Sequence, residues 1–364
     1  MNKSLPRWAD IILIPLLNLA LAMVVAGLVV VFIGEDPIQA MKLIIQGAFA
    51  PYGIGFTLYY TTNFIFTGLA VAVAFHARLF NIGGEGQAAI AGVGVALVCL
   101  AFDWPHWSMA LLAAMVGGML FGAGWAAIPA YLQAKRGSHI VITTIMFNLI
   151  AASLINFLLV GPMQAPGMAP ETSGFPAGAS LPTLHDIFAV VGVAFDKNAP
   201  VNISLFIALI ACVFVWLLIW KSRLGYEIRA FGHSEKAAVY AGISPLKITM
   251  IAMLISGALA GLLAINTVMG EAERLVLDSV QGAGFVGIAV ALMGRNHPLG
   301  VLLAAFLFGI LYQGGSELAF EMPGISREMI VVIQGLVIMF TGSLENLVRM
   351  PVTRLFTRFK RGAV

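Results

Sequence analysis

The sequence predicts an all-α, polytopic membrane protein with about ten transmembrane helices. Of its 364 residues, 60% are hydrophobic and only 10% are charged, and the mean hydropathy is +0.97. A soluble protein carries about 25% charged residues to cover its surface, so a soluble enzyme is excluded. The 39 glycines agree with this class, because small residues let helices pack closely in lipid.

Long apolar runs are the candidates for membrane spans, since about 20 apolar residues cross a bilayer as a helix. The runs lie at 11–33, 56–75, 87–102, 108–131, 140–160, 201–220, 248–269, 283–294, 299–313 and 328–343. The eighth and ninth runs are short, so each is a candidate for a broken or re-entrant helix. With ten spans, the first five and the last five helices run in opposite directions, which is compatible with an inverted repeat.

The positions of the basic residues predict the orientation of these spans. With the N-terminus in the cytoplasm, all but four of the 20 Lys and Arg residues fall on cytoplasmic segments, as the positive-inside rule requires. Both termini are then cytoplasmic, and we expect a multi-pass protein of the bacterial inner membrane. The chain is expected to form a single transmembrane domain over 1–364, with an extracytoplasmic loop at 161–200 and a cytoplasmic loop at 221–247.

The sequence contains no recognisable catalytic apparatus. It has no Walker motif or HExxH, and its six histidines lack metal-ligand spacing, so we expect no catalytic residue, no cofactor and no metal. The GxGxxG pattern at Gly282–Gly287 opens an apolar segment and does not lie between a strand and a helix, so it does not indicate nucleotide binding. Two GxxxG pairs, Gly118–Gly122 and Gly257–Gly261, predict close helix contact.

The segment Phe80–Gln87, with the sequence FNIGGEGQ, follows a run rich in hydroxyl and amide side chains. Its two adjacent glycines interrupt a helix and free backbone groups, which must be satisfied by protein or by a hydrated cavity. Glu85 at mid-bilayer would cost about 2.5–3.5 kcal/mol on insertion scales. The segment is therefore either a plain cytoplasmic turn anchored by Arg78 or a broken helix that lines a translocation route.

The cytoplasmic loop contains a second notable segment, Gly225–Ile243. Ser234 is a plausible N-cap for a short helix, and Gly242 a plausible terminator. Such a helix would present the small side chains of Ala237, Ala238 and Ala241 beside charged residues. This pattern favours a knob that docks into a groove on a partner protein.

These segments resemble the permease subunits of ABC importers. Phe80–Gln87 is similar to the FNIGxEGQ signature of the branch that includes ribose and other simple-sugar, nucleoside and branched-chain amino-acid permeases. Lys221–Ile243 resembles the coupling loop of that branch, and Thr144–Asn148 and Gly284–Gly294 also match. The resemblance covers residues 55–345 and is greatest to the longer of the two permeases in nucleoside-type importers. It implies a type II-like importer permease fold.

The resemblance also implies a function and a set of partners. The chain would translocate a nucleoside or simple sugar, with ATP hydrolysis in a separate subunit. Expected partners are a second homologous permease, a cytoplasmic ATP-binding subunit, an extracytoplasmic solute-binding lipoprotein and membrane lipids, but no nucleic acid. The candidates for the translocation path are Asn63, Asn81, Glu85, Gln87, Asn148 and Phe285. The candidates for coupling to the ATPase are Arg229, Gly232, Ser234, Glu235, Ala237, Ala238, Ala241 and Gly242.

Two other functions compete with this interpretation. An ion-coupled secondary transporter of a small polar solute usually carries ionisable residues inside its spans, whereas the predicted spans contain almost none apart from Glu85. A membrane-embedded enzyme would need a catalytic constellation. Co-purification of an ATPase subunit would discriminate between the importer and both alternatives.

Overall fold

A computed structural model describes residues 13–189, 196–340 and 349–354. Over these residues the regular structure is helical, apart from two isolated β-bridges, Glu171–Val276 and Thr183–Asn202. The chain divides into two compact units, one made of residues 1–50 and 310–364 and the other of residues 51–309. The predicted all-α membrane fold is confirmed, and both termini lie outside the described residues.

The first unit begins with two helices, α1 (Ile14–Ile33) and α2 (Pro37–Phe49). They are bent by 117° at a short break, where Asp36 accepts a hydrogen bond from the backbone N–H of Ile38 at 2.8 Å and caps α2. The apolar core of this unit joins α1 and α2 to the last part of α13 (Pro298–Glu321) and to α14 (Arg327–Ile338).

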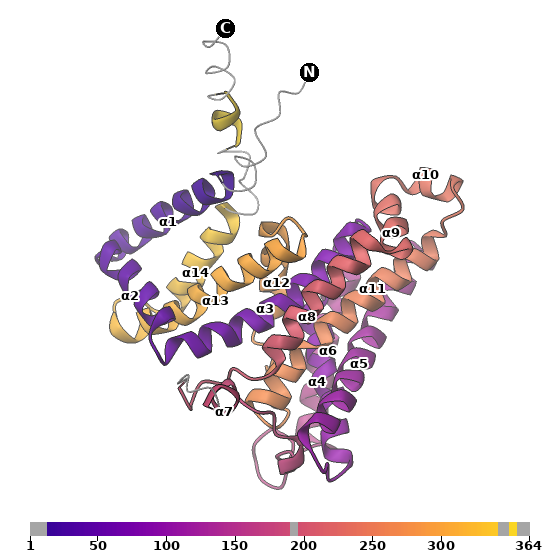
Figure 1. Cartoon of the computed structure of the whole chain (residues 1–364), viewed down its shortest axis with the longest axis horizontal. Coiled ribbons are helices and arrows are strands. Elements are labelled where there is room, and N and C mark those ends of the chain that lie inside the picture. Colours follow the sequence, from indigo (N-terminus) through magenta and orange to yellow (C-terminus); the bar gives the residue numbers. More distant parts are fainter. Residues whose placement is uncertain (1–12, 190–195, 341–348, 355–364) are drawn as a thin grey trace. The chain divides into compact units, whose positions relative to one another are not determined.

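The second unit contains the remaining elements (Figure 1). Its membrane-length elements are α3 (Gly53–His76), α4 (Gly84–Ala101), α5 (Trp107–Arg136), α6 (Ile140–Val160), α8 (Ser204–Trp216) with the π-helix η3 (Leu217–Lys221), and α11 (Pro245–Gly261) with the π-helix η4 (Ile265–Glu271). Its shorter elements are the 3₁₀ turn η2 (Ala177–Ala179), α7 (Leu184–Ala189), α9 (Arg223–His233), α10 (Glu235–Tyr240) and α12 (Ala283–Met293). The first part of α13 completes the unit.

Helix α3 is the centre of the second unit. In the most apolar 18-residue stretch of α3, 83% of the stretch is buried, whereas only 28% of the corresponding stretch of α6 is buried. The exposed side chains of α5 and α6 include large apolar residues such as Leu112, Leu120 and Phe157. A helix in lipid needs no polar outer face, so this exposed apolar surface is what a membrane-spanning bundle requires.

The two GxxxG pairs pack against each other, as part of the contact between α5 and α11. A methyl group added to Gly122 would overlap the carbonyl oxygen of Gly257, and one added to Gly118 would lie 3.1 Å from that of Gly261. The predicted close helix contact is thus confirmed. The absence of side chains at these positions lets the two backbones touch.

Within the described residues, the number of membrane-length helices is smaller than the ten predicted spans. Seven of the helices in the described residues are long and apolar enough to span a membrane, or eight if the bent α1–α2 pair is one span. The predicted run at 283–294 forms α12, which has only 11 residues, whereas the run at 299–313 lies within a 24-residue helix, α13. The described part of the last run includes α14, with 12 residues, and residues 341–343 of that run lie outside the described residues. An apolar run predicts burial or lipid contact, but not whether the helix continues beyond it.

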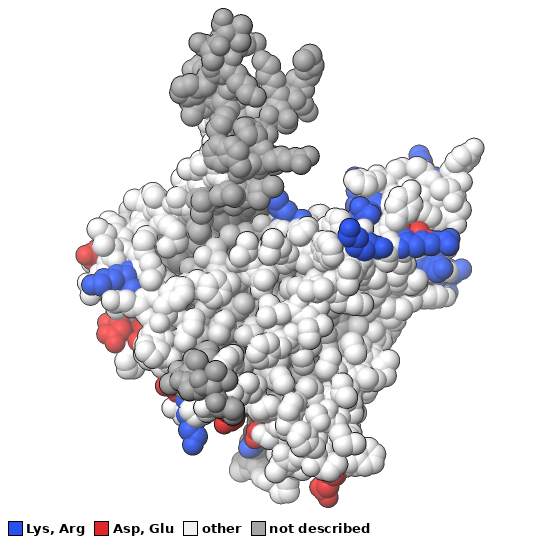
Figure 2. Space-filling view, in the orientation of Figure 1, with Lys and Arg blue, Asp and Glu red and all other residues white. Residues whose placement is uncertain are grey.

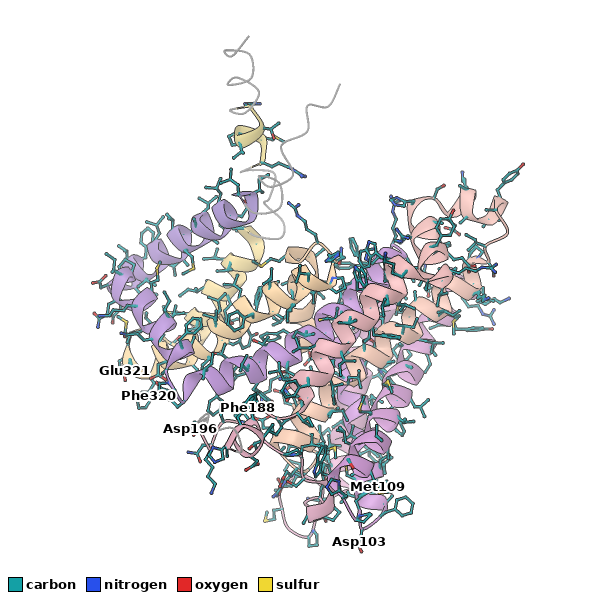
Figure 3. The ribbon with its side chains drawn as sticks, in the orientation of Figure 1. Asp103, Met109, Phe188, Asp196, Phe320 and Glu321 are labelled. Carbon is teal, nitrogen blue, oxygen red and sulfur yellow. The ribbon has the colours of Figure 1, made fainter. Side chains whose placement is uncertain are left out.

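The two ends of the second unit differ in charge. Helices α9 and α10 form one end, and Figure 2 shows Lys and Arg atoms gathered over them. The opposite end holds the α4–α5 turn with Asp103, and the loop after α6, in which Phe188 and Asp196 lie (Figure 3). As predicted for residues 161–200, the described part of this loop contains only η2 and the six-residue α7.

Candidate translocation site

The chain turns back into the second unit after α3. Helix α3 ends at His76, and the N–H of Leu79 donates to the carbonyl oxygen of Ala74 at 3.0 Å. The non-helical segment that follows is packed inside the unit, since Leu79, Asn81 and Gly83 are all buried. FNIGGEGQ is therefore a buried break in the helical structure between α3 and α4, two separate membrane-length helices. That it lines a translocation route stays a prediction.

Asn81 and Gln87 form a buried amide pair across this break. The Asn81 amide nitrogen donates to Gln87 Oε1 and to Ser256 Oγ, both at 2.9 Å. Asn81 Oδ1 accepts from the backbone N–H of Gly83 at 2.9 Å. Ser256, on α11, in turn donates to the carbonyl oxygen of Ala70 at 2.6 Å. The pair therefore satisfies a backbone donor that the break leaves free and joins it to α3 and α11.

Asn148, on α6, binds the backbone on both sides of the break. Its Oδ1 accepts from the backbone N–H of Gly86 at 2.9 Å, and its amide nitrogen donates to the carbonyl oxygen of Ile82 at 2.9 Å. The structure thus brings together three of the predicted path residues, Asn81, Gln87 and Asn148. All three are buried, and Asn81 and Asn148 bind the backbone of the break. Their role in a path stays a prediction.

Glu85 reaches from the first turn of α4 to the first turn of α12. Its two carboxylate oxygens accept the backbone N–H groups of Gly282 at 2.9 Å and Gly284 at 2.8 Å. A carboxylate is favoured here because a helix N-terminus carries partial positive charge and unpaired N–H groups. A methyl group on Gly284 would overlap the backbone of Glu85. The two helices therefore meet by their N-terminal ends, which the sequence did not show.

The surface beside this junction is aromatic and polar. Phe285, on the first turn of α12, is 48% exposed, and Glu85 is half-buried. Asp278 and Gln281 are exposed on the segment that leads into α12, and both have positive φ, 56° and 51°. Neither residue was predicted as a path candidate, although both lie within four residues before the GxGxxG pattern.

Asn63, the remaining path candidate, lies in a separate polar cluster. Its Oδ1 accepts from the amide nitrogen of Asn266 at 2.8 Å, and Asn266 Oδ1 accepts from Ser204 Oγ at 2.7 Å and from the Asn202 amide at 2.9 Å. The neighbouring Tyr59 hydroxyl donates to Glu271. The cluster joins α3, α8 and η4, and the sequence indicated no such partners for Asn63.

The short helix of the charged loop forms as predicted at both ends. Ser234 Oγ accepts from the backbone N–H of Ala237 at 3.3 Å, and Gly242 ends the helix with φ +82°. Glu235, Ala237 and Ala241 are exposed.

Two of the coupling candidates are placed differently from the prediction. Ala238 is only 2% exposed, because a six-residue helix that folds back on α9 must turn one face inward. Gly232 is also buried, against the carbonyl oxygen of His76, and Arg229 Nε donates to the carbonyl oxygen of Gly225 at 3.4 Å. The exposed face instead includes Val239, at 50%, and Tyr240, at 96%, which were not predicted.

A bundle of membrane-length apolar helices, with a buried amide network inside it and a charged loop at one end, is typical of a polytopic membrane protein. Residues 53–342 match the family described as the branched-chain amino acid transport system / permease component. This chain belongs to that family of ABC transporter permease subunits.

Three relatives, named for two different solutes, differ in their identity to this chain. The guanosine ABC transporter permease protein NupP of Bacillus subtilis is 35% identical over 91% of this chain and 93% of its own length. The glucose ABC transporter permease protein TsgB13 of Haloferax volcanii is 33% identical over 98% of this chain and 93% of its own. A second guanosine permease of the same Bacillus strain, NupQ, is 28% identical over 75% of this chain and 82% of its own. No solved structure matches the chain.

Proposed function

We propose that this chain is the membrane-spanning subunit of an ATP-driven importer for a nucleoside or a simple sugar. The observation that best supports this proposal is the junction at which Glu85 binds the N-terminus of α12. The exposed ring of Phe285 lies beside it. An aromatic face next to carboxylate and amide groups suits a solute with an apolar face and several hydroxyl groups. The relatives named for guanosine and glucose fit the same chemistry.

The distribution of charge supports an orientation in a bacterial inner membrane. The end of the second unit that carries α9 and α10 is basic, so we assign it to the cytoplasm by the positive-inside rule. The opposite end, with Asp103 and the loop around Phe188, is then extracytoplasmic. The Lys and Arg residues near both ends of the sequence support cytoplasmic termini by the same rule.

The exposed face of α10 is the proposed docking site for the ATP-binding subunit. Tyr240 and Val239 expose an apolar surface on a cytoplasmic helix, where no lipid would cover it. Tyrosine is among the residues that most often dominate protein interfaces. Because this chain has no Walker motif, ATP hydrolysis is assigned to that partner.

A second permease and a solute-binding protein complete the proposed importer. Two guanosine permeases from one Bacillus strain match this chain at different identities, which supports pairing of this longer type with a shorter, homologous permease. The loop between α6 and α8, on the extracytoplasmic side, is the proposed contact for a solute-binding lipoprotein.

The experiment measures uptake of labelled guanosine and glucose by cells that carry the importer, with and without this chain. We expect uptake of one of these solutes to require the chain and cellular ATP, and to persist when ionophores collapse the ion gradients. Uptake that stops with the ion gradient and is insensitive to ATP depletion would instead indicate a secondary transporter.

The docking site is tested with a matched pair of variants. Tyr240→Asp should cost about 2 kcal/mol of binding, as for an interface hot spot, and so reduce recovery of the ATP-binding subunit with the purified permease. Lys236→Glu, on the same helix and also exposed, should leave recovery unchanged. Equal recovery with both variants would show that this face does not bind the ATPase.

A further inference from the structure

We propose that His76, Trp220 and Gly232 form a mechanical joint that transmits movement of the α9–α10 segment to the α4–α12 junction. This proposal rests on the proposed function and assigns positioning roles to three residues that touch neither the solute nor the ATPase. It is drawn from a closed chain of contacts within the second unit.

The first link makes α9 move together with Trp220. Ser222 Oγ donates to the carbonyl oxygen of Leu218 at 2.6 Å and accepts from the backbone N–H of Gly225 at 3.0 Å. A methyl group on Gly225 would overlap the carbonyl oxygens of Leu218 and Ile219. The corner between η3 and α9 is therefore tight, and Trp220 lies within it.

The second link is an aromatic cluster around Trp220, with the His76 ring edge-on to it and the His297 ring tilted. The ring centroid of Trp220 lies 5.1 Å from that of His76 and 4.9 Å from that of His297. His76 ends α3, directly before the broken segment, and His297 precedes α13, shortly after α12. Trp220 thus contacts the cytoplasmic ends of both parts of the chain that lead to the Glu85 junction.

The third link is a backbone contact between α9 and α3. A methyl group on Gly232 would overlap the carbonyl oxygen of His76, so the last turn of α9 rests directly on the end of α3. Here glycine is required by the close approach, not by the backbone conformation, since Gly232 is helical. Any tilt of α9 would therefore press on His76.

The fourth link closes the ring. His76 Nε2 lies 3.1 Å from the carbonyl oxygen of Asn296, which joins the end of α3 to the turn after α12. From His76 the chain continues through 77–83 to Glu85, and Glu85 holds the other end of α12. A force on His76 thus reaches α12 at both of its ends, and α4 at its first turn.

This geometry predicts that breaking the joint separates ATP hydrolysis from transport. The docking surface around Tyr240 and the junction at Glu85 both remain intact in such a variant. The ATPase should bind and hydrolyse ATP, but its movement should no longer open and close the path. Coupling free energies of this kind typically correspond to about 5–150-fold.

The test uses the complete importer in proteoliposomes and measures solute transported per ATP hydrolysed. We expect Trp220→Leu and His76→Leu to lower this ratio about tenfold, with ATPase recovery and ATP hydrolysis within about twofold of wild type. His76→Gln keeps an N–H donor for Asn296 but loses the ring contact with Trp220, so its ratio should lie between those of His76→Leu and the wild type. Trp216→Leu, one turn away at a residue that is 37% exposed, is the matched control and should have no effect.

The possible outcomes separate this proposal from the proposed function. An unchanged ratio in both Trp220→Leu and His76→Leu overturns the joint, even though ATP-dependent transport by the wild type would still support an importer. Equal loss of hydrolysis and transport, or loss of folded protein, also overturns it by showing a purely structural role. Gly232→Ala is an independent test, because it alters the α9–α3 contact without changing any aromatic ring. It should also lower the amount of solute transported per ATP hydrolysed.

Discussion

Two pairs of helices in this protein approach each other through glycines, but the two contacts differ in what surrounds them. At the α5–α11 contact, four glycines at four-residue spacing bring the backbones together, and both helices are apolar on either side. At the α4–α12 contact, Gly84 and Gly284 lie beside the carboxylate of Glu85. The first contact is direct packing of backbone on backbone, whereas the second is a junction held by hydrogen bonds to a carboxylate.

The difference indicates which contact is fixed and which can change during transport. Apolar packing between backbones has no polar competitor in lipid, so the α5–α11 contact loses energy whenever it opens. The N–H groups held by Glu85 can exchange their partner for water or for a solute hydroxyl, because a hydrogen bond replaced by another costs little net free energy. We therefore infer that α5 and α11 move as one body and that the α4–α12 junction opens and closes.

The largest effect on folding is expected when the α5–α11 contact is broken. Gly122→Leu places a side chain against the backbone of Gly257, which cannot move aside as a flexible side chain would. Overpacking in a core typically costs about 1–3 kcal/mol, and a clash with backbone lies at the upper end. We expect loss of most folded protein, measured as monodisperse permease after extraction in detergent.

Gly124→Leu is the control for this variant, since nothing lies within 4 Å of a methyl group at Gly124. It lies on the same helix, two residues away, and should leave the yield unchanged. Normal yield of Gly122→Leu would show that the α5–α11 contact is looser than its geometry indicates.

A smaller effect on folding, but a large one on transport, is expected at the charged junction. Glu85→Leu removes both acceptors of the Gly282 and Gly284 N–H groups. Uptake should fall at least about tenfold, as expected when a hydrogen bond to a charged group worth about 1.5–3 kcal/mol is lost. Membrane insertion should be preserved, as judged by the amount of permease in membranes.

Glu85→Gln separates the effect of the charge from the effect of losing both acceptors. The amide keeps one oxygen acceptor but carries no charge, so uptake should lie between that of the wild type and that of Glu85→Leu. Wild-type uptake in both variants would remove the junction from the mechanism.

The difference between the two contacts could be predicted only in part from the sequence. Spacing of four residues puts Gly118 and Gly122 on one helix face, so a close contact could be predicted, but not that its partner is the Gly257–Gly261 pair. The two adjacent glycines at Gly83 predicted a break. The partner of Glu85 lies 197 residues away, and no local pattern specifies such a distance.

The charged loop shows a second limit of the same kind. Ser234 and Gly242 predicted the ends of α10, because capping depends on neighbouring residues. Which face of α10 is exposed depends on how the helix folds against α9. Alanine is compatible with either face, so Ala238 was predicted on the surface and lies inside. Tyr240, by contrast, is 96% exposed and was overlooked.

The smallest effects test the asymmetry within the charged junction itself. A methyl group on Gly84 would lie 3.6 Å from the carbonyl oxygen of Gly284, which is an ordinary contact distance, whereas one on Gly284 would overlap the backbone of Glu85. Gly284→Ala should therefore push α12 away from Glu85 and lower uptake several-fold, by about 1 kcal/mol of lost hydrogen bonding. Gly84→Ala should change uptake by less than about twofold, and should slightly stabilise the first turn of α4 because alanine is a better helix former than glycine. The measurement is the initial uptake rate, normalised to permease in the membrane, for the two variants side by side. Equal uptake by both variants would show that α12 tolerates displacement at its N-terminus, and that Glu85 does not hold it at a fixed distance.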